Sequence, residues 1–250
     1  MQVELRSRLT DFSSRVEIVT DSYANMRQIL HPRKVNGVLL DLGFNSVHVD
    51  EGDRGFSFLL DGPLDMRYDQ SSGITAADLI NELDSPFLCA IFTQFSGESI
   101  RTCRHVANAI VSRRQSKGQF TSTKELAGFL NHLLMGGRPK KKNVSTTPCT
   151  GLFQALRIAV NNEFQHLDSL MSDLPFILEK GGVFIALCFQ SLEIRRLKTW
   201  VRWYLDGDSE WRKTHLLEDQ AVGNSKTQNR NCNEYQSCNF NIQLMYSFQY

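Results

Sequence analysis

An acidic residue follows a short apolar run at a position where ligands often bind. The run Val38-Leu39-Leu40 is typical of a strand buried on both faces in a parallel sheet, and Asp41 lies at its carboxyl end. In open α/β sheets, ligands bind at this edge. Asp41 is therefore a candidate binding residue, although an aspartate at this place also suits a turn after the strand.

A second candidate region is residues 52–73, whose Gly, Asp and Pro content indicates an ordered loop. Its Phe56 and Phe58 have the shape to stack on a nucleic-acid base, or alternatively to pack beneath the loop. Basic side chains with the chemistry to contact phosphates are Arg54, Arg67, Arg113, Arg114 and the lysine run 140–142. A run of charges is, however, usually only a solvated face.

The composition is that of an ordinary globular protein. With 250 residues, 41% of them hydrophobic, the chain can form one core or one core with an inserted subdomain. Its net charge of +1 lacks the basic excess typical of nucleic-acid binders, although local patches matter more than the sum. The cysteines form no C-x-x-C pair, and the sequence shows no metal-ligand cluster. No apolar run reaches the ~20 residues that a membrane span needs.

Strand and helix patterns alternate along the chain. We expect strands at 16–19, 35–40 and 183–189. Ser22 would cap a short helix, and further helices are expected at about 76–83, 86–95, 99–115, 122–135 and 197–205. One long helix should run from 153 to 174, where Pro175 ends or kinks it. Because no convincing strand falls between about 70 and 136, we interpret that block as a helical insertion between two parts of a sheet. Beyond Asp219 the chain is rich in Asn, Gln and Ser, a composition typical of disorder.

Three stretches together resemble one protein family. They are NGVLLDLGFNS at 36–46, RGFSF-x-x-DGPLDMR at 54–67, and FQALRI at 153–158 with Asn161, Asn162, Glu163 and FQSLE at 189–193. These residues resemble the RsmH/MraW family of ribosomal RNA methyltransferases, and the second string is long enough to be highly specific. The resemblance covers about residues 15–193, with a poor stretch near 127–149.

The resemblance implies a fold and a division into domains. We expect an α/β fold, with an incomplete Rossmann-like methyltransferase sheet and an inserted helical subdomain. Residues 1–69 and 149–193 would form the Rossmann-like part that binds the cofactor, residues 70–148 the helical insertion, and residues 194–250 a divergent, partly disordered tail.

The resemblance also implies an activity: S-adenosyl-L-methionine would be the cofactor, and the N4 amine of a cytosine in small-subunit ribosomal RNA the acceptor. Tyr23, Asp41 and His48 match cofactor-binding positions, and Asp41 or Asn45 would accept hydrogen bonds from the amine in catalysis. Alternatively, Tyr23 is an aromatic residue of the hydrophobic core. His48 stands where the family usually has Gln, and its alternative is a solvated loop residue. We expect no metal and no membrane. The divergence from the bacterial pattern favours the mitochondrial matrix, with the cytoplasm as the alternative.

The sequence departs from the family near both ends. Residues 1–14 contain no glycine, and the family's glycine-rich cofactor loop and following ribose-binding acid are not found there. After Glu193 the chain continues with Ile194 and lacks the family's closing basic segment. We therefore expect a chain truncated at its N-terminus and divergent at its C-terminus. Two alternatives to an enzyme follow: a noncatalytic relative that binds ribosomal RNA or a ribosomal protein, and an unstable fragment.

Overall fold

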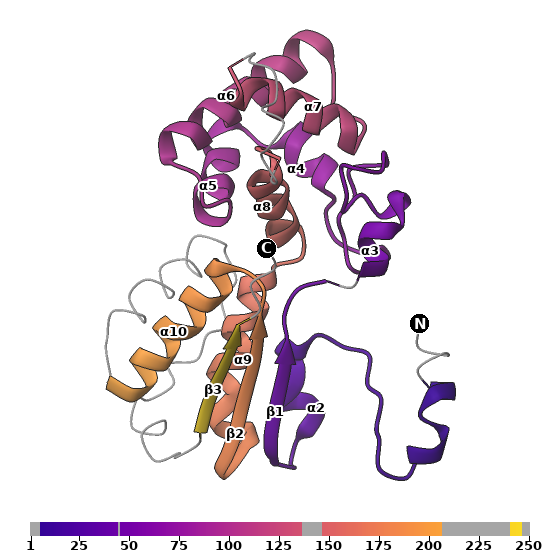
Figure 1. Ribbon diagram of the computed structural model, residues 1–250, viewed down its shortest axis with the longest axis vertical. Coiled ribbons are helices and arrows are strands. Elements are labelled where there is room, and N and C mark those ends of the chain that lie inside the picture. Colours follow the sequence, from indigo (N-terminus) through magenta and orange to yellow (C-terminus); the bar gives the residue numbers. More distant parts are fainter. Residues whose placement is uncertain (1–5, 45, 137–146, 207–240, 247–250) are drawn as a thin grey trace.

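The chain forms a parallel sheet with helices beside it and, above these, a second group of helices (Figure 1). This computed structural model describes residues 6–44, 46–136, 147–206 and 241–246. Each part has its own cluster of buried hydrophobic side chains. The arrangement confirms the expected α/β class with an inserted helical subdomain.

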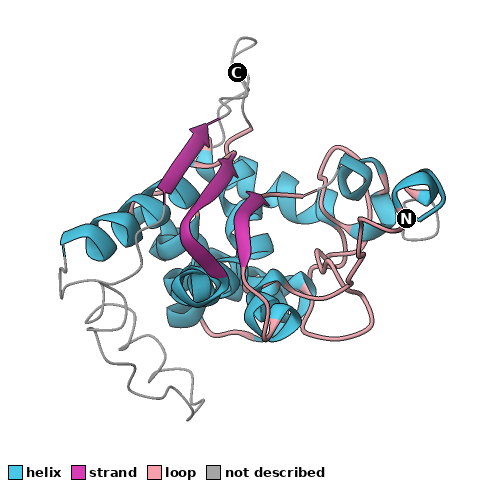
Figure 2. Cartoon of the chain, turned by 90° about the horizontal axis from the view of Figure 1, so that it is seen from below, coloured by secondary structure: helices cyan, strands magenta, loops and turns pink. Residues whose placement is uncertain are grey.

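Three parallel strands form the sheet, in the order β1 (Val35–Asp41), β2 (Leu178–Cys188) and β3 (Asn241–Tyr246). Figure 2 shows them side by side. Asp41 lies opposite Leu187, and Cys188 lies opposite Tyr246, so the carboxyl ends of the strands meet at one edge. This small parallel sheet confirms the expectation of an incomplete Rossmann-like sheet. Strand β3 was not predicted, because it lies in a tail whose polar composition favours disorder.

Helices α2 (Met26–Leu30), α9 (Glu163–Ile177) and α10 (Ser191–Asp206) share one hydrophobic cluster with the sheet. The cluster takes alternate strand residues, among them Val38 and Leu40 of β1. Leu39, which points to the opposite face, is 67% exposed. The prediction of a strand buried on both faces is therefore wrong for β1, because the described helices cover only the face that carries Val38 and Leu40.

The helical part contains α4 (Ala76–Glu82), α5 (Ser85–Phe95), α6 (Ile100–Lys117), α7 (Thr123–Leu134) and α8 (Thr150–Val160). Helix α4 begins with a capping box, in which the Thr75 hydroxyl accepts from the Asp78 N–H and the Asp78 carboxylate accepts from the Thr75 N–H. Residues 70–136 are all described and form no strand apart from a single bridge between Ser122 and Pro63. The helical insertion is thus confirmed.

The long helix expected from 153 to 174 is two helices, α8 and α9. The break falls at Asn162, whose φ of 50° and ψ of 36° are left-handed, a conformation that Asn tolerates better than most residues. The apolar stripe divides there: Phe153 and Leu156 pack in the helical part, whereas Leu167 and Leu174 pack under the sheet. Pro175 does not end α9, which continues to Ile177.

The remaining N-terminal and C-terminal predictions have mixed outcomes. Residues 16–19 form no strand, and Val16 and Val19 are exposed. Ser22 caps a short 3-10 helix, Tyr23–Asn25, that continues into α2, which confirms the capped helix. Helix α10 covers the helix predicted at 197–205, which is also confirmed. The rest of the tail expected to be disordered lies outside the described residues. No described helix has the length and apolar character to cross a membrane.

Candidate active site

The candidate site lies where β1 and β2 end. Asp41 is the last residue of β1 and is exposed. The next residue, Leu42, still donates its N–H to the Leu187 carbonyl oxygen at 3.1 Å, so the chain leaves the sheet only at Gly43. Gly43 has a φ of 110°, which disfavours a residue with a side chain, and a Cβ there would touch the ring of Phe189. The sequence Asp-Leu-Gly thus turns the chain sharply at the carboxyl edge of the sheet.

Glu163, the first residue of α9, joins the parts of this site. Its carboxylate accepts hydrogen bonds from Arg157 Nε at 2.7 Å, from Arg157 Nη2 at 3.0 Å and from the Tyr68 hydroxyl at 3.0 Å. Its backbone carbonyl accepts from the Tyr23 hydroxyl at 3.2 Å. One residue therefore ties together α8, the loop that contains Tyr68, and the short helix that contains Tyr23.

This cluster is largely shielded from water. The Arg157 and Glu163 side chains are 7% and 13% exposed. Burial, and next the negative charge of Glu163, raise the pKa of both Tyr23 and Tyr68. Both phenols therefore remain neutral hydrogen-bond donors at physiological pH, and neither is available as a base.

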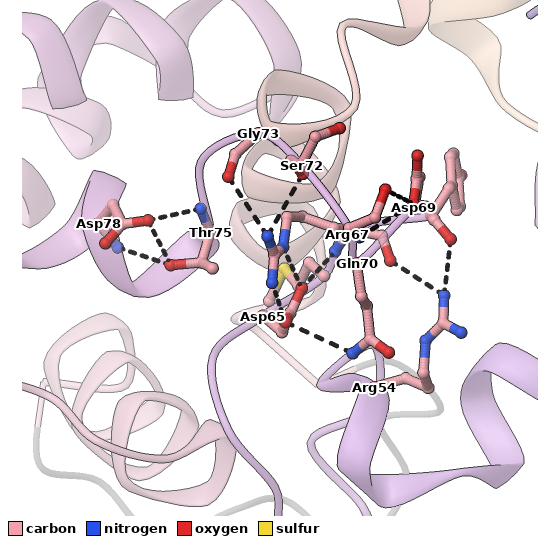
Figure 3. A network of polar contacts seen from close by, with 12 residues as sticks. Arg54, Asp65, Arg67, Asp69, Gln70, Ser72, Gly73, Thr75 and Asp78 are labelled. Carbon is pink, nitrogen blue, oxygen red and sulfur yellow. Dashed lines mark hydrogen bonds and ion pairs between the residues drawn. The ribbon is translucent and has the colours of Figure 1, made fainter.

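The loop 54–73 is held by its own arginines (Figure 3). Arg54 Nη2 donates to the carbonyl oxygens of Arg67 at 3.0 Å and Tyr68 at 2.8 Å. Arg67 forms a two-point ion pair with Asp65, with Nε and Nη2 each 2.9 Å from a carboxylate oxygen. In this arrangement, the geometry does not support the expected phosphate contacts of Arg54 and Arg67, because both guanidinium groups bind the loop itself.

Two glycines of the RGFSF-x-x-DGPLDMR string lie where the chain passes against itself. A Cβ at Gly55 would overlap the Pro63 carbonyl oxygen, and one at Gly62 would overlap that of Gly52. Gly55 also has a left-handed φ of 72°. The glycines of this string are thus required by the close folding of the loop.

The loop is anchored on both sides. Leu64 and Met66 insert into the hydrophobic core of the helical part, where they are 2% and 1% exposed. Asn161, between α8 and α9, donates from Nδ2 to the Met66 carbonyl oxygen at 2.8 Å, and its Oδ1 accepts from the Tyr68 N–H at 2.7 Å. The break that the sequence did not predict therefore supplies the groups that hold this loop beside the sheet edge.

Four aromatic rings stack beside the cluster. Phe56 lies 5.5 Å from Tyr68, 5.0 Å from His48 and 6.2 Å from Phe44, with interplanar angles of 13°, 25° and 26°. The Arg157 guanidinium lies over Phe44, 4.7 Å from the ring centroid. Phe44 is 43% exposed, so the stack opens to solvent on this side.

His48, in α3 (Ser46–Asp50), has a buried ring nitrogen. Its Nδ1 makes no hydrogen bond among the described residues. Burial, followed by the charge of Arg54, lowers the pKa of His48, so the ring is neutral at pH 7 and its nitrogens can include one acceptor. A buried polar atom of this kind is suited to a ligand that brings the missing hydrogen bond.

A second buried carboxylate shapes the end of β2. Glu193 is 3% exposed and accepts from the backbone N–H groups of Phe189 at 2.9 Å and Gln190 at 3.1 Å. The Gln190 side chain in turn accepts from Gln154 Nε2 at 2.6 Å. Burial raises the pKa of Glu193, although these two N–H groups act against that shift. The FQSLE string is thus a capped strand-to-helix turn.

The structure brings two of the predicted residues to the Glu163–Tyr68 pair: the Tyr23 hydroxyl donates to the Glu163 carbonyl oxygen, and the His48 ring lies 5.5 Å from that of Tyr68. Asp41 ends β1, three residues before Phe44 of the ring stack. Asn45 lies outside the described residues, as do the lysines 140–142. Phe58 packs edge-on against Phe153 at 5.1 Å in the helical part, so it serves packing, whereas Phe56 belongs to the stack.

Sequence reasoning assigned no role to Arg157, Asn161, Glu163 or Tyr68. All four stand in or beside matched motifs, which was the available signal, but only the fold shows that they meet. Within the part of the chain that the structure describes, no group of three or more His, Cys, Asp or Glu side chains is placed to hold a metal ion.

The parallel sheet, the site at its carboxyl edge and the helical insertion define a Rossmann-like α/β protein. A family model described as the MraW methylase family matches residues 1–222, and the chain belongs to that family.

Curated relatives agree with this assignment. The chain is 36% identical over 204 residues to a protein of Chlorobium luteolum, covering 78% of this chain and 60% of the relative. It is 38% identical over 216 residues to one of Rhodospirillum rubrum (85% and 63%) and 41% identical over 195 residues to one of Ralstonia pickettii (76% and 59%). All three carry the name ribosomal RNA small subunit methyltransferase H. The chain spans about three fifths of the length of these relatives.

Proposed function

We propose that this chain transfers a methyl group from S-adenosyl-L-methionine to the N4 amine of a cytosine in small-subunit ribosomal RNA. Membership of the MraW methylase family and the names of its relatives support the reaction class and the RNA. The observation that carries the proposal is an exposed carboxylate, Asp41, at the carboxyl edge of a parallel sheet and three residues before Phe44, the exposed end of the ring stack.

The acceptor amine needs help from the protein, since its lone pair is delocalised into the cytosine ring. A hydrogen-bond acceptor placed at the amine hydrogens localises that lone pair and orients it for attack. Asp41 supplies two carboxylate oxygens at the strand end. We assign the same acceptor role to the Asn45 side-chain oxygen, as an alternative or second partner.

Access to the amine requires the base to leave its stack in the RNA. Phe44 is the exposed end of the ring stack, and its open edge is where an extruded cytosine would meet the protein. Arg157 lies over the Phe44 ring, and its ion pair with Glu163 holds the guanidinium in that place.

The residues present fit one side of the cofactor. When bound, S-adenosyl-L-methionine supplies an electrophilic sulfonium methyl group. Asp41 and the Nδ1 of His48, which has no partner among the described residues, would hold it by hydrogen bonds, and Tyr23 would position it through its hydrogen bond to Glu163. The described residues 6–34 contain no strand and so no glycine-rich strand-to-helix loop, which makes direct cofactor binding the critical measurement.

The test uses the full chain, a small-subunit ribosomal RNA transcript and S-adenosyl-L-methionine labelled in its methyl group. Mass spectrometry of the digested RNA should find labelled N4-methylcytidine, and calorimetric titration should show cofactor binding. RNA binding without label would favour the noncatalytic alternative. Absence of a cooperative thermal transition would favour an unstable fragment.

We further propose the mitochondrial matrix as the location, on the strength of the divergence from the bacterial motifs. Fractionation of cells with an antibody against the chain should place it with matrix markers. Recovery only with cytoplasmic markers would overturn this part of the proposal.

A further inference from the structure

Helix α6 concentrates positive charge in a chain that is nearly neutral. Its sequence, IRTCRHVANAIVSRRQSK, contains five Lys or Arg residues and no Asp or Glu, whereas the net charge of the whole chain is +1. A helix of 18 residues is about 27 Å long at 1.5 Å per residue. The helix therefore presents a long cationic element on the helical part of the molecule (Figure 1).

Two of its arginines are occupied inside the fold. Arg113 donates to the Gly118 carbonyl oxygen and pairs with Glu125. Arg114 donates to the Ile80 carbonyl oxygen at 2.7 Å. These are the two arginines of the helix that the sequence suggested as phosphate contacts, and both are instead committed to holding α6 against its neighbours.

The outward side of α6 is different. Successive residues of an α-helix turn by about 100°, so one side collects Arg101, Arg104, His105, Asn108, Ser112 and Gln115, all of which are exposed. We call these six residues the basic face of α6. The opposite side carries Cys103, Val106 and Ile110, which are fully buried in the helical core.

We propose that the basic face of α6 binds the phosphate backbone of RNA; the inference rests on the proposed function in taking RNA as the partner. Arginine, asparagine, serine and glutamine are the side chains that contact phosphate and sugar oxygens. Helix α6 and helix α5, which packs against it, contain no Asp or Glu. The acidic residues that flank them in the chain are Glu98 before α6 and Asp84 before α5. The face thus recognises the backbone without reading sequence and holds the RNA while the sheet edge receives the base.

Salt dependence tests this contact directly. The full chain is titrated into a fluorescein-labelled single-stranded RNA oligonucleotide at several salt concentrations, and fluorescence anisotropy gives the binding constant. Each phosphate contact on a single strand contributes about 0.7 to the slope of log K against log salt. The double variant Arg101→Gln, Arg104→Gln should therefore lower the magnitude of that slope by about 1.4.

The matched control is Arg195→Gln, Arg202→Gln. It removes the same charge from the exposed surface of α10, at the other end of the molecule in Figure 1. It should leave the slope unchanged, and both variants should keep the wild-type thermal transition, since all four side chains are exposed.

The outcomes separate the two proposals. An unchanged slope in the α6 variant, or an equal loss in the α10 control, overturns the inference even if the chain methylates RNA. A slope reduced only in the α6 variant supports it even if no methyl transfer is detected, in which case the proposed function alone fails. Failure of the wild-type chain to bind the oligonucleotide also overturns it.

Discussion

Glu163 accepts hydrogen bonds from both Nε and Nη2 of Arg157, at 2.7 and 3.0 Å, across the break between α8 and α9. Arg157 belongs to the helix that packs in the helical part, and Glu163 begins the helix that packs under the sheet. The pair therefore couples the two parts of the molecule at the point where the candidate site forms.

We expect Glu163→Gln to destabilise the fold. The amide keeps the shape of the side chain but leaves the Arg157 guanidinium, 7% exposed, without its counter-charge. Breaking a buried pair from one side in this way should lower the free energy of unfolding by about 3–5 kcal/mol. Urea unfolding followed by circular dichroism measures the change.

Glu179→Gln is the control for this variant, because Glu179 is an exposed residue of β2. It should stay within about 0.5 kcal/mol of the wild type. Equal stability of the Glu163 and Glu179 variants would mean that the Arg157 pair contributes nothing to holding the two parts together.

Gly62→Ala should also destabilise, for a steric reason. Its Cβ would overlap the Gly52 carbonyl oxygen, a backbone atom that cannot move without opening the loop. We expect the free energy of unfolding to fall by about 1–3 kcal/mol.

Gly128→Ala is the matched control, for which we expect a gain in stability. Gly128 lies inside α7, and a Cβ there meets nothing within 4 Å. The substitution should therefore raise the free energy of unfolding by about 0.5–1 kcal/mol. Thermal melts of both variants measure the difference, and a gain in stability for Gly62→Ala would refute the overlap.

The sequence predicted the positions of the helices and strands better than it predicted which of their faces are buried and against what. The cap at Thr75 and the apolar periodicity of α5 to α7 are local signals, and those helices form where expected. The break at Asn162 was missed because the apolar stripe continues through it with helical spacing, while its two halves face different cores. The exposure of Leu39 was missed because a run of three apolar residues does not reveal whether both faces of a sheet are covered.

The candidate site was predictable in part for a similar reason. Asp41, at the end of an apolar run, is a local signal of the sheet edge. Glu163, however, bonds to Tyr23 and Tyr68, which lie 140 and 95 positions before it in the chain. The spacing of residues along the sequence carries no information about contacts of this kind.

We expect acid to destabilise the loop 54–73 by protonating Asp65. Hydrogen bonds from Arg67 hold the pKa of Asp65 below its ordinary value of 3.8, despite partial burial. A lowered pKa in the folded state means that this stabilisation is fully present above pH 3.8 and is lost as the pH falls through the folded-state pKa. Asp65→Asn should therefore be less stable than the wild type at neutral pH and less sensitive to acid.

Unfolding midpoints measured from neutral to acidic pH check this prediction. Asp53→Asn, at an exposed carboxylate in the neighbouring short helix Gly52–Arg54, should keep the acid sensitivity of the wild type. If Asp65→Asn loses stability in acid as steeply as the wild type, the Arg67 pair is not the source of the effect.

Asp41→Asn separates chemistry from folding. The side chain is exposed, so the thermal transition should not move. If its carboxylate accepts a hydrogen bond from the cytosine amine, the amide should lower kcat for methyl transfer by about 100-fold or more, because an asparagine can present its N–H₂ to the amine instead of an acceptor. Asp84→Asn, an exposed residue of the helical part, should leave kcat unchanged. Single-turnover transfer of labelled methyl groups to the RNA measures the rate, with the cofactor affinity of each variant determined separately by titration. A variant that keeps the wild-type rate but binds the cofactor less tightly would show that Asp41 serves the cofactor alone and that the acceptor for the amine lies elsewhere on the sheet edge.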